Sequence, residues 1–183
     1  MRKLLFLTIT AIWGVSCSSL LVGFTPSSYC EDKIIELIDN SAESIDIAVY
    51  SINNTNIVDA LKKAHSKGIK IRILTDRLQA SGKSSRVKEL WSKGLNIKVH
   101  SKFKIEHNKF AIYDGKTIST GSYNWTNPAS SKNSENCIFI SNNRKTVSEY
   151  QNRFDYLWKI NSKQKSDKWF QKKARKAKQL ERY

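Results

Sequence analysis

Residues 44–75 read SIDIAVYSINNTNIVDALKKAHSKGIKIRILT, and this stretch decides the fold class. Its two ends, residues 44–50 and 69–75, are short and mostly apolar, which is typical of buried strands. The segment between them repeats apolar residues at helical spacing. Gly68 stands where a glycine commonly ends a helix. The stretch therefore predicts a strand–helix–strand unit.

The flanking sequence continues this alternation and then changes. We expect the following further elements: strands at 21–24, 95–99, 109–113, 117–120 and 137–141, and helices from Ser28 or Glu31, at 84–93 and at 147–160. Asp114-Gly115 is a hairpin-type turn between two of the later strands. The pattern predicts an α/β fold of one domain per chain, with a mixed, largely parallel central sheet flanked by helices on both faces.

Composition limits the possible function classes. The chain has 183 residues, 39% of them hydrophobic, which suits one folded domain and argues against disorder. Seven glycines and two prolines exclude a collagen-like chain, and one long apolar run at the N-terminus excludes a polytopic membrane protein. The formal net charge of +16 favours a polyanionic partner, either nucleic acid or an anionic membrane.

The N-terminus resembles a targeting segment. Arg2 and Lys3 precede the apolar run 4–13, and small residues follow, as in a secretory signal peptide. We expect residues 1–20 to be this signal and the protein to be secreted or periplasmic. An uncleaved membrane anchor is the alternative reading. Cys17 lies in a weak match to a lipoprotein cleavage box, so a lipid anchor at this residue is a further possibility.

The remaining cysteines and the C-terminus leave alternatives open. Cys30 and Cys137 are either a disulfide pair, which an oxidising compartment permits, or two buried apolar residues. No CxxC pair or Cys/His cluster occurs, which argues against a structural zinc site. Residues 161–183 form a basic tail after the domain at 21–160. This tail is either a solvated helix or a segment that contacts a membrane or nucleic acid.

One histidine stands out by its neighbours. His65 needs no function at the basic end of its helix, and His100 is left unassigned. His107 is followed two residues later by Lys109, and strand alternation places both on one face. An imidazole can attack phosphorus while a fixed ammonium stabilises the charge on its oxygens. Asn124 is a candidate neutral donor to the same oxygens, and Glu135 is a candidate to orient the His107 ring.

The spacing of these residues resembles a known family. The pattern H-x-K-x4-D-x6-G-S-x-N is that of the phospholipase D superfamily, and the chain looks like its small exported members that carry one motif. The similarity runs from about residue 22 to residue 159. Every fixed position is filled, by His107, Lys109, Asp114, Gly121, Ser122 and Asn124.

The resemblance implies a mechanism without metal or other cofactor. One histidine attacks phosphorus to form a phosphohistidine, and a second protonates the leaving oxygen and later activates water. Because this chain carries one motif, the site requires a homodimer, with His107 of each chain meeting at a two-fold axis. Lys109 and Asn124 would bind the phosphate and Glu135 would hydrogen-bond His107. Asp114 would be structural support, with Gly121 and Ser122 completing the motif.

Three functions are compatible with this sequence. The first is a secreted phospholipase D that acts on phospholipids, and the second is a non-specific endonuclease that uses the same site. The motif does not separate these two. The third is a non-catalytic basic protein that binds nucleic acid or membrane, and the intact motif argues against it.

Overall fold

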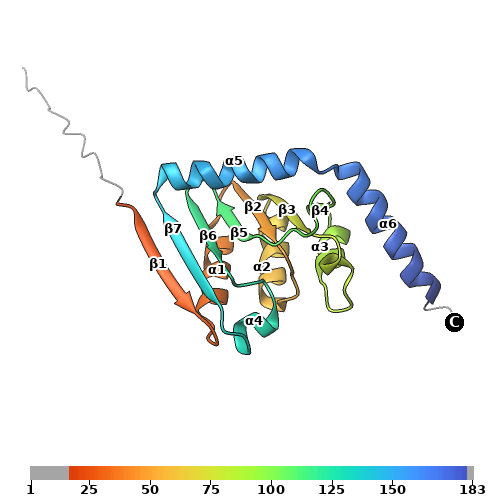
Figure 1. Cartoon of the computed structure of the whole chain (residues 1–183), viewed down its shortest axis with the longest axis horizontal. Coiled ribbons are helices and arrows are strands. Elements are labelled where there is room, and N and C mark those ends of the chain that lie inside the picture. The colour runs from red at the N-terminus through yellow and green to blue at the C-terminus, as the bar shows by residue number, and fades with distance from the viewer. Residues whose placement is uncertain (1–16, 181–183) are drawn as a thin grey trace, which may run out of the picture.

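A computed structural model describes residues 17–180, which form one seven-stranded sheet with helices. The strand order is β1-β7-β6-β5-β2-β3-β4 (Figure 1). The strands are β1 (Ser19–Phe24), β2 (Ser44–Val49), β3 (Lys70–Asp76), β4 (Asn96–His100), β5 (Lys109–Tyr113), β6 (Thr117–Gly121) and β7 (Asn136–Ser141). The helices are α1 (Tyr29–Asn40), α2 (Thr55–Ser66), α3 (Val87–Ser92), α4 (Asn127–Ser131), α5 (Arg144–Ile160) and α6 (Lys163–Leu180).

The sheet is mixed, as predicted, but it is not largely parallel. Only β2–β3 and β3–β4 are parallel pairs, and the other four pairings are antiparallel. The helical crossovers end with β4, and the strands that follow are joined through turns that reverse the chain direction. Asp114 and Gly115 both have positive φ in the β5–β6 turn, which confirms the predicted hairpin.

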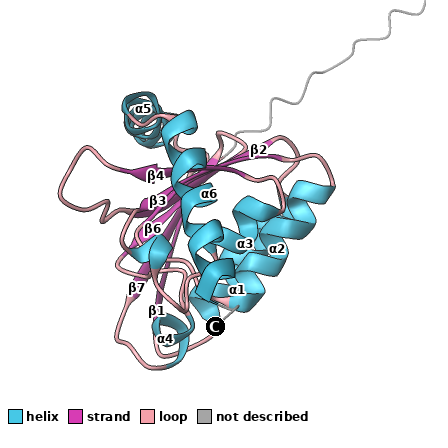
Figure 2. Ribbon diagram, turned by 90° about the vertical axis from the view of Figure 1, so that its right-hand side faces the viewer, coloured by secondary structure: helices cyan, strands magenta, loops and turns pink. Residues whose placement is uncertain are grey.

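Helices cover both faces of the sheet, as expected. α1, α2 and α3 lie on one face, and α5 runs along the other (Figure 2). The larger core lies under α1 to α3 and includes the fully buried Ile47 and Leu61. The smaller core lies under α5 and includes Phe110 and Phe154. Burial of these apolar side chains is the main contribution that holds the layers together.

Local sequence explains where helices begin. α2 starts at the Asn54 side chain, which accepts a hydrogen bond from the Ile57 N–H (3.0 Å). The helix predicted at 84–93 begins only at Val87, and it follows a turn in which the Ser85 N–H donates to the Gly82 carbonyl (3.1 Å).

The basic C-terminal segment is part of the domain. The Phe170 side chain of α6 is fully buried and stacks on Trp91, with 5.2 Å between ring centroids. The Val99 N–H donates to Ser166 Oγ (3.1 Å), which links α6 to β4. The folded domain therefore extends past residue 160, and one face of the predicted tail is neither solvated nor separate.

The N-terminal boundary also differs by two residues. β1 begins at Ser19, whereas the sequence places the domain start at residue 21. Most of the predicted signal segment lies outside the described residues. No helix within residues 17–180 is long and apolar enough to cross a membrane.

The structure decides between the two readings of the cysteines. Cys30 of α1 and Cys137 of β7 form a disulfide bond, and both are buried. Cys17 is a free, exposed thiol. The disulfide joins the first helix to a strand 107 positions later in the sequence and so constrains the unfolded chain.

Candidate active site

The motif residues gather at one edge of the sheet. At this edge β2, β3 and β4 end, β5 begins, β6 ends and β7 begins. Val49 near the end of β2 pairs with Lys109, and Gly121 at the end of β6 pairs with Cys137. Ligand sites in sheets with parallel strands commonly lie beyond the carboxyl ends of those strands.

His107 and Lys109 meet at the ring of Tyr50. The exposed His107 ring lies 4.6 Å from the Tyr50 ring between centroids, and Lys109 Nζ lies 5.0 Å from the same ring. Lys109 Nζ also donates a hydrogen bond to the His107 carbonyl (2.6 Å). The two side chains therefore lie side by side, and Tyr50 is a contributor that sequence reasoning missed.

The charge of Lys109 depends on its acidic neighbours. Burial lowers the pKa of the Lys109 ammonium, while the negative charges of Glu135 and Glu106 act in the opposite direction. The pKa remains below its ordinary value. Glu135 therefore affects the site through its negative charge, which raises the pKa of Lys109 against the larger effect of burial.

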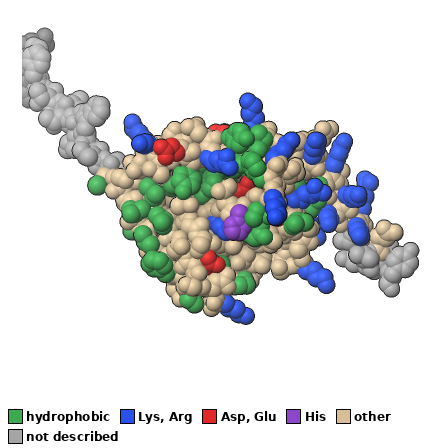
Figure 3. All heavy atoms as spheres, viewed as in Figure 1, with side chains coloured by type: hydrophobic (Ala, Val, Ile, Leu, Met, Phe, Trp, Pro, Cys, Tyr) green, Lys and Arg blue, Asp and Glu red, His purple; other side chains and the backbone are tan. Residues whose placement is uncertain are grey.

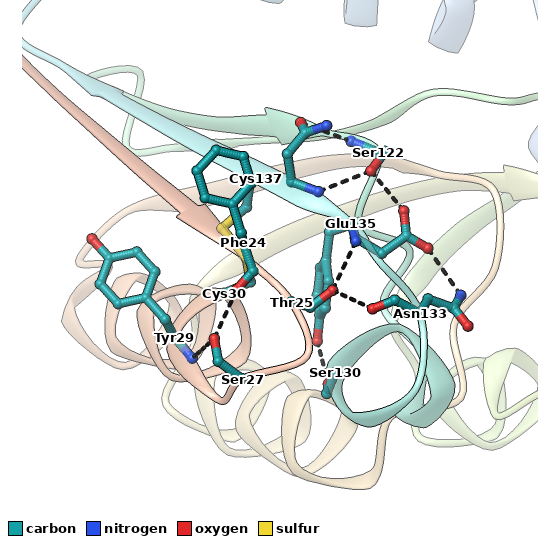
Figure 4. The surroundings of a disulfide bond; sticks show 12 residues. Phe24, Thr25, Ser27, Tyr29, Cys30, Ser122, Ser130, Asn133, Glu135 and Cys137 are labelled. Atoms are coloured by element: carbon teal, nitrogen blue, oxygen red, sulfur yellow. Dashed lines mark hydrogen bonds between the residues drawn. A yellow bond between two sulfur atoms is a disulfide. The ribbon is translucent and has the colours of Figure 1, made fainter.

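Glu135 does not contact His107 within the single chain. Ser122 Oγ donates to one Glu135 carboxylate oxygen (2.6 Å), and Asn133 Nδ2 donates to the other (2.9 Å), as Figure 4 shows. The hydrogen bond from Glu135 to His107 that the resemblance implies is therefore absent here. The Cys30–Cys137 disulfide is drawn beside this carboxylate in Figure 4. Its Cys137 lies in β7 and follows Glu135 by two residues.

Ser122 and Asn124 have different roles. β6 ends at Gly121, so Ser122 and Asn124 lie beyond the strand. Ser122 Oγ accepts from the Asn136 N–H (3.0 Å) and fixes the start of β7. Asn124 Oδ1 is buried and has no hydrogen-bond partner among the described residues. An unsatisfied buried acceptor is destabilising, so the Asn124 amide is a group that the fold itself does not use.

Asp114 and Gly121 are both involved in the backbone structure near the motif. The Asp114 carboxylate accepts from the N–H groups of Ala42, Glu43 and Ser44 at 2.8–2.9 Å. Burial alone would raise the pKa of Asp114, but these hydrogen bonds outweigh burial and lower it. Gly121 has φ +142°, and a Cβ there would lie 2.4 Å from the Asn136 carbonyl oxygen.

The β4–β5 loop (residues 101–108) is held by buried acids that sequence reasoning missed. The Glu106 side chain is almost fully buried and accepts from the Asn108 N–H (3.3 Å) and amide (2.5 Å). The Glu106 N–H donates to Asp76 Oδ2 (3.1 Å). Its carboxylate lies 3.7 Å from the ring of His100, whose pKa burial lowers. The only indication of this role in the sequence was that Glu106 stands directly before His107.

A pocket of about 330 Å³ opens beside the motif. Its walls include His107 and Lys109 from the sheet edge and Glu149, Tyr150 and Arg153 from α5. Within residues 17–180, no group of three or more His, Cys, Asp or Glu side chains has the arrangement of a metal site. Metal-independent chemistry remains a prediction.

The chain matches known proteins over most of its length. Residues 34–158 match the family described as "Cardiolipin synthase, PLD-like domain". The chain is 35% identical to the phospholipase D of Rickettsia prowazekii over 79% of this chain and 70% of that protein. It is 32% identical to the mitochondrial cardiolipin hydrolase of Chlamydomonas reinhardtii over 73% of this chain, but that match spans only 59% of the hydrolase.

A solved structure agrees with the fold. The phospholipase D family member Nuc of Salmonella typhimurium superposes with a TM-score of 0.75 at 29% identity. The match covers 79% of this chain and 97% of Nuc. NucT of Helicobacter pylori, at 23% identity and a TM-score of 0.73, supports the fold alone. The expected fold and family are confirmed: this chain belongs to the phospholipase D superfamily.

Proposed function

We propose that this protein is a phospholipase D-type phosphodiesterase that hydrolyses phospholipid phosphodiester bonds through a covalent phosphohistidine. The observation that carries the proposal is the pairing of the exposed His107 ring with the Lys109 ammonium at the mouth of a pocket. The names of relatives that are at least 30% identical, phospholipase D and cardiolipin hydrolase, support a phosphoric diester hydrolase.

The proposed reaction has two steps. A His107 ring nitrogen attacks phosphorus, the phosphorus–oxygen bond to the leaving alcohol breaks, and that oxygen takes a proton from a general acid. Water then attacks the phosphohistidine, gives its proton to the same group, and releases the phosphate monoester. Lys109 and Asn124 stabilise the charge on the remaining phosphate oxygens. No step requires a metal or other cofactor.

The proposed general acid comes from a second copy of the chain. One chain supplies one motif histidine, so we propose a homodimer in which the partner subunit's His107 protonates the leaving oxygen. The His107 ring is exposed and has no hydrogen bond among the described residues, which leaves it accessible to such a partner. A strictly monomeric enzyme with full activity would contradict this arrangement.

A non-specific endonuclease that uses the same residues is the second candidate. The excess of positive charge favours it, since contacts between lysine or arginine and phosphate dominate nucleic-acid binding. A non-catalytic basic binding protein has less support. It would leave the intact motif, with His107, Lys109 and Asn124 all present, without a purpose.

We also propose that the protein is secreted or periplasmic, with residues 1–20 as a signal peptide. The Cys30–Cys137 disulfide supports this proposal, because such bonds persist in oxidising compartments. Lipidation of Cys17 has only the weak sequence match in its favour. Sequencing the N-terminus of the exported protein tests both points, and a chain that retains Met1 in the cytoplasm would contradict them.

Trapping the intermediate tests the mechanism most directly. The purified enzyme is mixed with a phospholipid labelled in its phosphate, quenched rapidly, and mapped for the labelled residue in the presence of a chelator. We expect label on His107. Label on another side chain, or loss of all activity with chelator, would contradict the proposal. Parallel assays on phospholipid vesicles and plasmid DNA separate the two substrates, and cleavage of DNA alone would favour the endonuclease.

A further inference from the structure

The β4–β5 loop exposes apolar side chains directly before the catalytic histidine. Phe103 is 48% exposed and Ile105 is 44% exposed, and they alternate with the exposed Lys102 and Lys104. Neither lysine forms an ion pair in the described part of the chain. Figure 2 shows the loop after β4 projecting away from the sheet. Alternating cationic and apolar side chains suit a surface that is both apolar and negatively charged.

The backbone of this loop is well anchored. The Phe103 N–H donates to His100 Nε2 (2.7 Å), and the two rings stack with 5.1 Å between centroids. At the other end the Glu106 N–H donates to the buried Asp76 carboxylate. Buried polar groups therefore fix the loop while its lysine and apolar side chains face outward.

Neighbouring elements extend the same surface. Leu78, in the loop after β3, is 71% exposed, and its N–H donates to the Asp76 carboxylate that also holds the β4–β5 loop. On α5, Tyr156 is 50% exposed. The Arg153 guanidinium lies 5.9 Å from the Phe103 ring and 5.5 Å from the Tyr156 ring. Lys and Arg side chains gather on the side of this face where α6 lies (Figure 3).

We propose that this docking surface binds the interface of an anionic phospholipid bilayer and presents the pocket to lipid headgroups. Arg153 connects the docking surface to the pocket, because it also lines the pocket that contains His107 and Lys109. The proposal rests on the proposed phospholipase function and identifies its substrate as lipid in a membrane. The docking surface consists of Leu78, Phe103, Ile105 and Tyr156, with Arg77, Lys102, Lys104 and Arg153.

The chemistry of the loop favours a bilayer over other partners. If the loop itself lay at the two-fold axis of a dimer contact, it would meet its own copy and bring lysines close to lysines, because residues 101–105 contain no carboxylate. Nucleic-acid bases stack on planar side chains, but Ile105 and Leu78 offer no planar face. At a bilayer, apolar side chains enter the interface while lysine and arginine contact anionic headgroups.

Vesicle binding by matched variants tests the proposal. The Phe103→Ser/Ile105→Ser variant is compared with Val22→Ser/Phe24→Ser, which removes exposed apolar side chains from β1 at the opposite edge of the sheet. The full chain is sedimented with vesicles of equal parts phosphatidylcholine and phosphatidylglycerol. We expect the loop variant to bind about ten-fold more weakly or worse, and the β1 variant to bind like wild type.

Charge and catalysis provide further readouts. Lys102→Glu/Lys104→Glu should weaken binding to the anionic vesicles and leave the weaker binding to pure phosphatidylcholine unchanged. The loop variant should lose hydrolysis of vesicle lipid in proportion to binding, but keep hydrolysis of the soluble diester bis(p-nitrophenyl) phosphate. Each variant is checked by circular dichroism, and light scattering gives its mass.

Three outcomes would overturn the docking proposal. The first is a folded loop variant that binds vesicles like wild type. The second is a loop variant whose mass in solution falls from that of a dimer to that of a monomer. The third is a loop variant that binds DNA more weakly but binds vesicles like wild type. Failure of the proposed function looks different. A wild-type protein that binds vesicles but hydrolyses neither lipid nor soluble diester would contradict the phospholipase and leave the membrane contact intact.

Discussion

The motif has a supporting half, which includes Asp114 and Ser122, and a reactive half, which includes His107 and Asn124. The two halves differ in how many of their polar groups find hydrogen-bond partners within one chain. Asp114 accepts three backbone hydrogen bonds, and Ser122 bonds both Glu135 and the backbone of Asn136. The His107 ring, by contrast, is exposed, and Asn124 Oδ1 is buried without a partner among the described residues. The hydrogen bonds of the supporting residues are thus made within the fold. The His107 ring and Asn124 Oδ1 make no such bonds within residues 17–180, and the His107 ring is accessible to a substrate or a partner chain.

This difference indicates how each half should respond to substitution. Changes in the supporting half should act mainly on stability, because they remove backbone hydrogen bonds or create overlap. Changes in the reactive half should act mainly on turnover, because the fold does not depend on those groups. Substitutions at His107, Gly121, Asp114 and Glu135 test this division.

His107→Asn should remove turnover with little change in stability. We expect kcat to fall by about 10³-fold or more, because asparagine supplies no nucleophilic nitrogen. The melting temperature should stay near wild type, since the ring is exposed. His65→Asn, at the end of α2, is the matched control and should keep full activity. Near-normal turnover by His107→Asn would remove the nucleophile assignment.

Gly121→Ala should reduce stability more than Gly115→Ala. Both glycines have positive φ, but a Cβ at Gly121 would overlap the Asn136 carbonyl, whereas nothing lies within 4 Å of one at Gly115. We expect losses of about 3 and 1 kcal/mol in the free energy of unfolding, respectively. Urea denaturation measures both. Equal losses would show that the crowding at Gly121 is relieved by movement.

Asp114→Asn should make stability less dependent on pH at acid values. The lowered pKa means that the carboxylate stabilises the fold above its unfolded pKa, and that this contribution disappears as pH falls through the folded pKa. We expect a loss of about 1–3 kcal/mol at pH 7 that shrinks in acid. Unfolding curves at several pH values measure it, and a pH-independent difference would contradict the charge-assisted role.

Glu135→Gln should move the alkaline limit of activity to lower pH. The Glu135 charge opposes the effect of burial on Lys109, so its removal should lower the pKa of that ammonium further. The pH profile of kcat/KM measures the shift. Glu43→Gln, an exposed carboxylate whose side chain has no hydrogen bond here, is the control. If the alkaline limit of kcat/KM stays at the same pH, Glu135 acts on a group other than Lys109.

Much of the fold was predictable because its signals are local. Apolar runs and helical repeats place all seven strands to within about two residues, and Asp114-Gly115 marks the hairpin. Strand direction was less predictable, since it depends on which strands become neighbours. The packing of α6 was missed because a basic composition hides one buried face, which centres on Phe170.

The candidate site was predictable where the motif spacing is fixed and not beyond it. Asp114 accepts three backbone hydrogen bonds, but the expected contact between Glu135 and His107 does not occur in one chain. Tyr50, Glu106 and Arg153 were missed because they come from different elements. No spacing along the chain reports that Tyr50 at the end of β2 lies against His107.

Local signals along the chain account for the α/β class, the Asp114-Gly115 turn and the order of the motif residues. These depend on backbone preferences and on interactions over a few residues. Only the tertiary structure decided the Cys30–Cys137 bond, the bonding of Glu135 and the combination of pocket and docking surface. Those features join residues that are far apart along the chain, and their proximity follows from how the sheet and helices pack together.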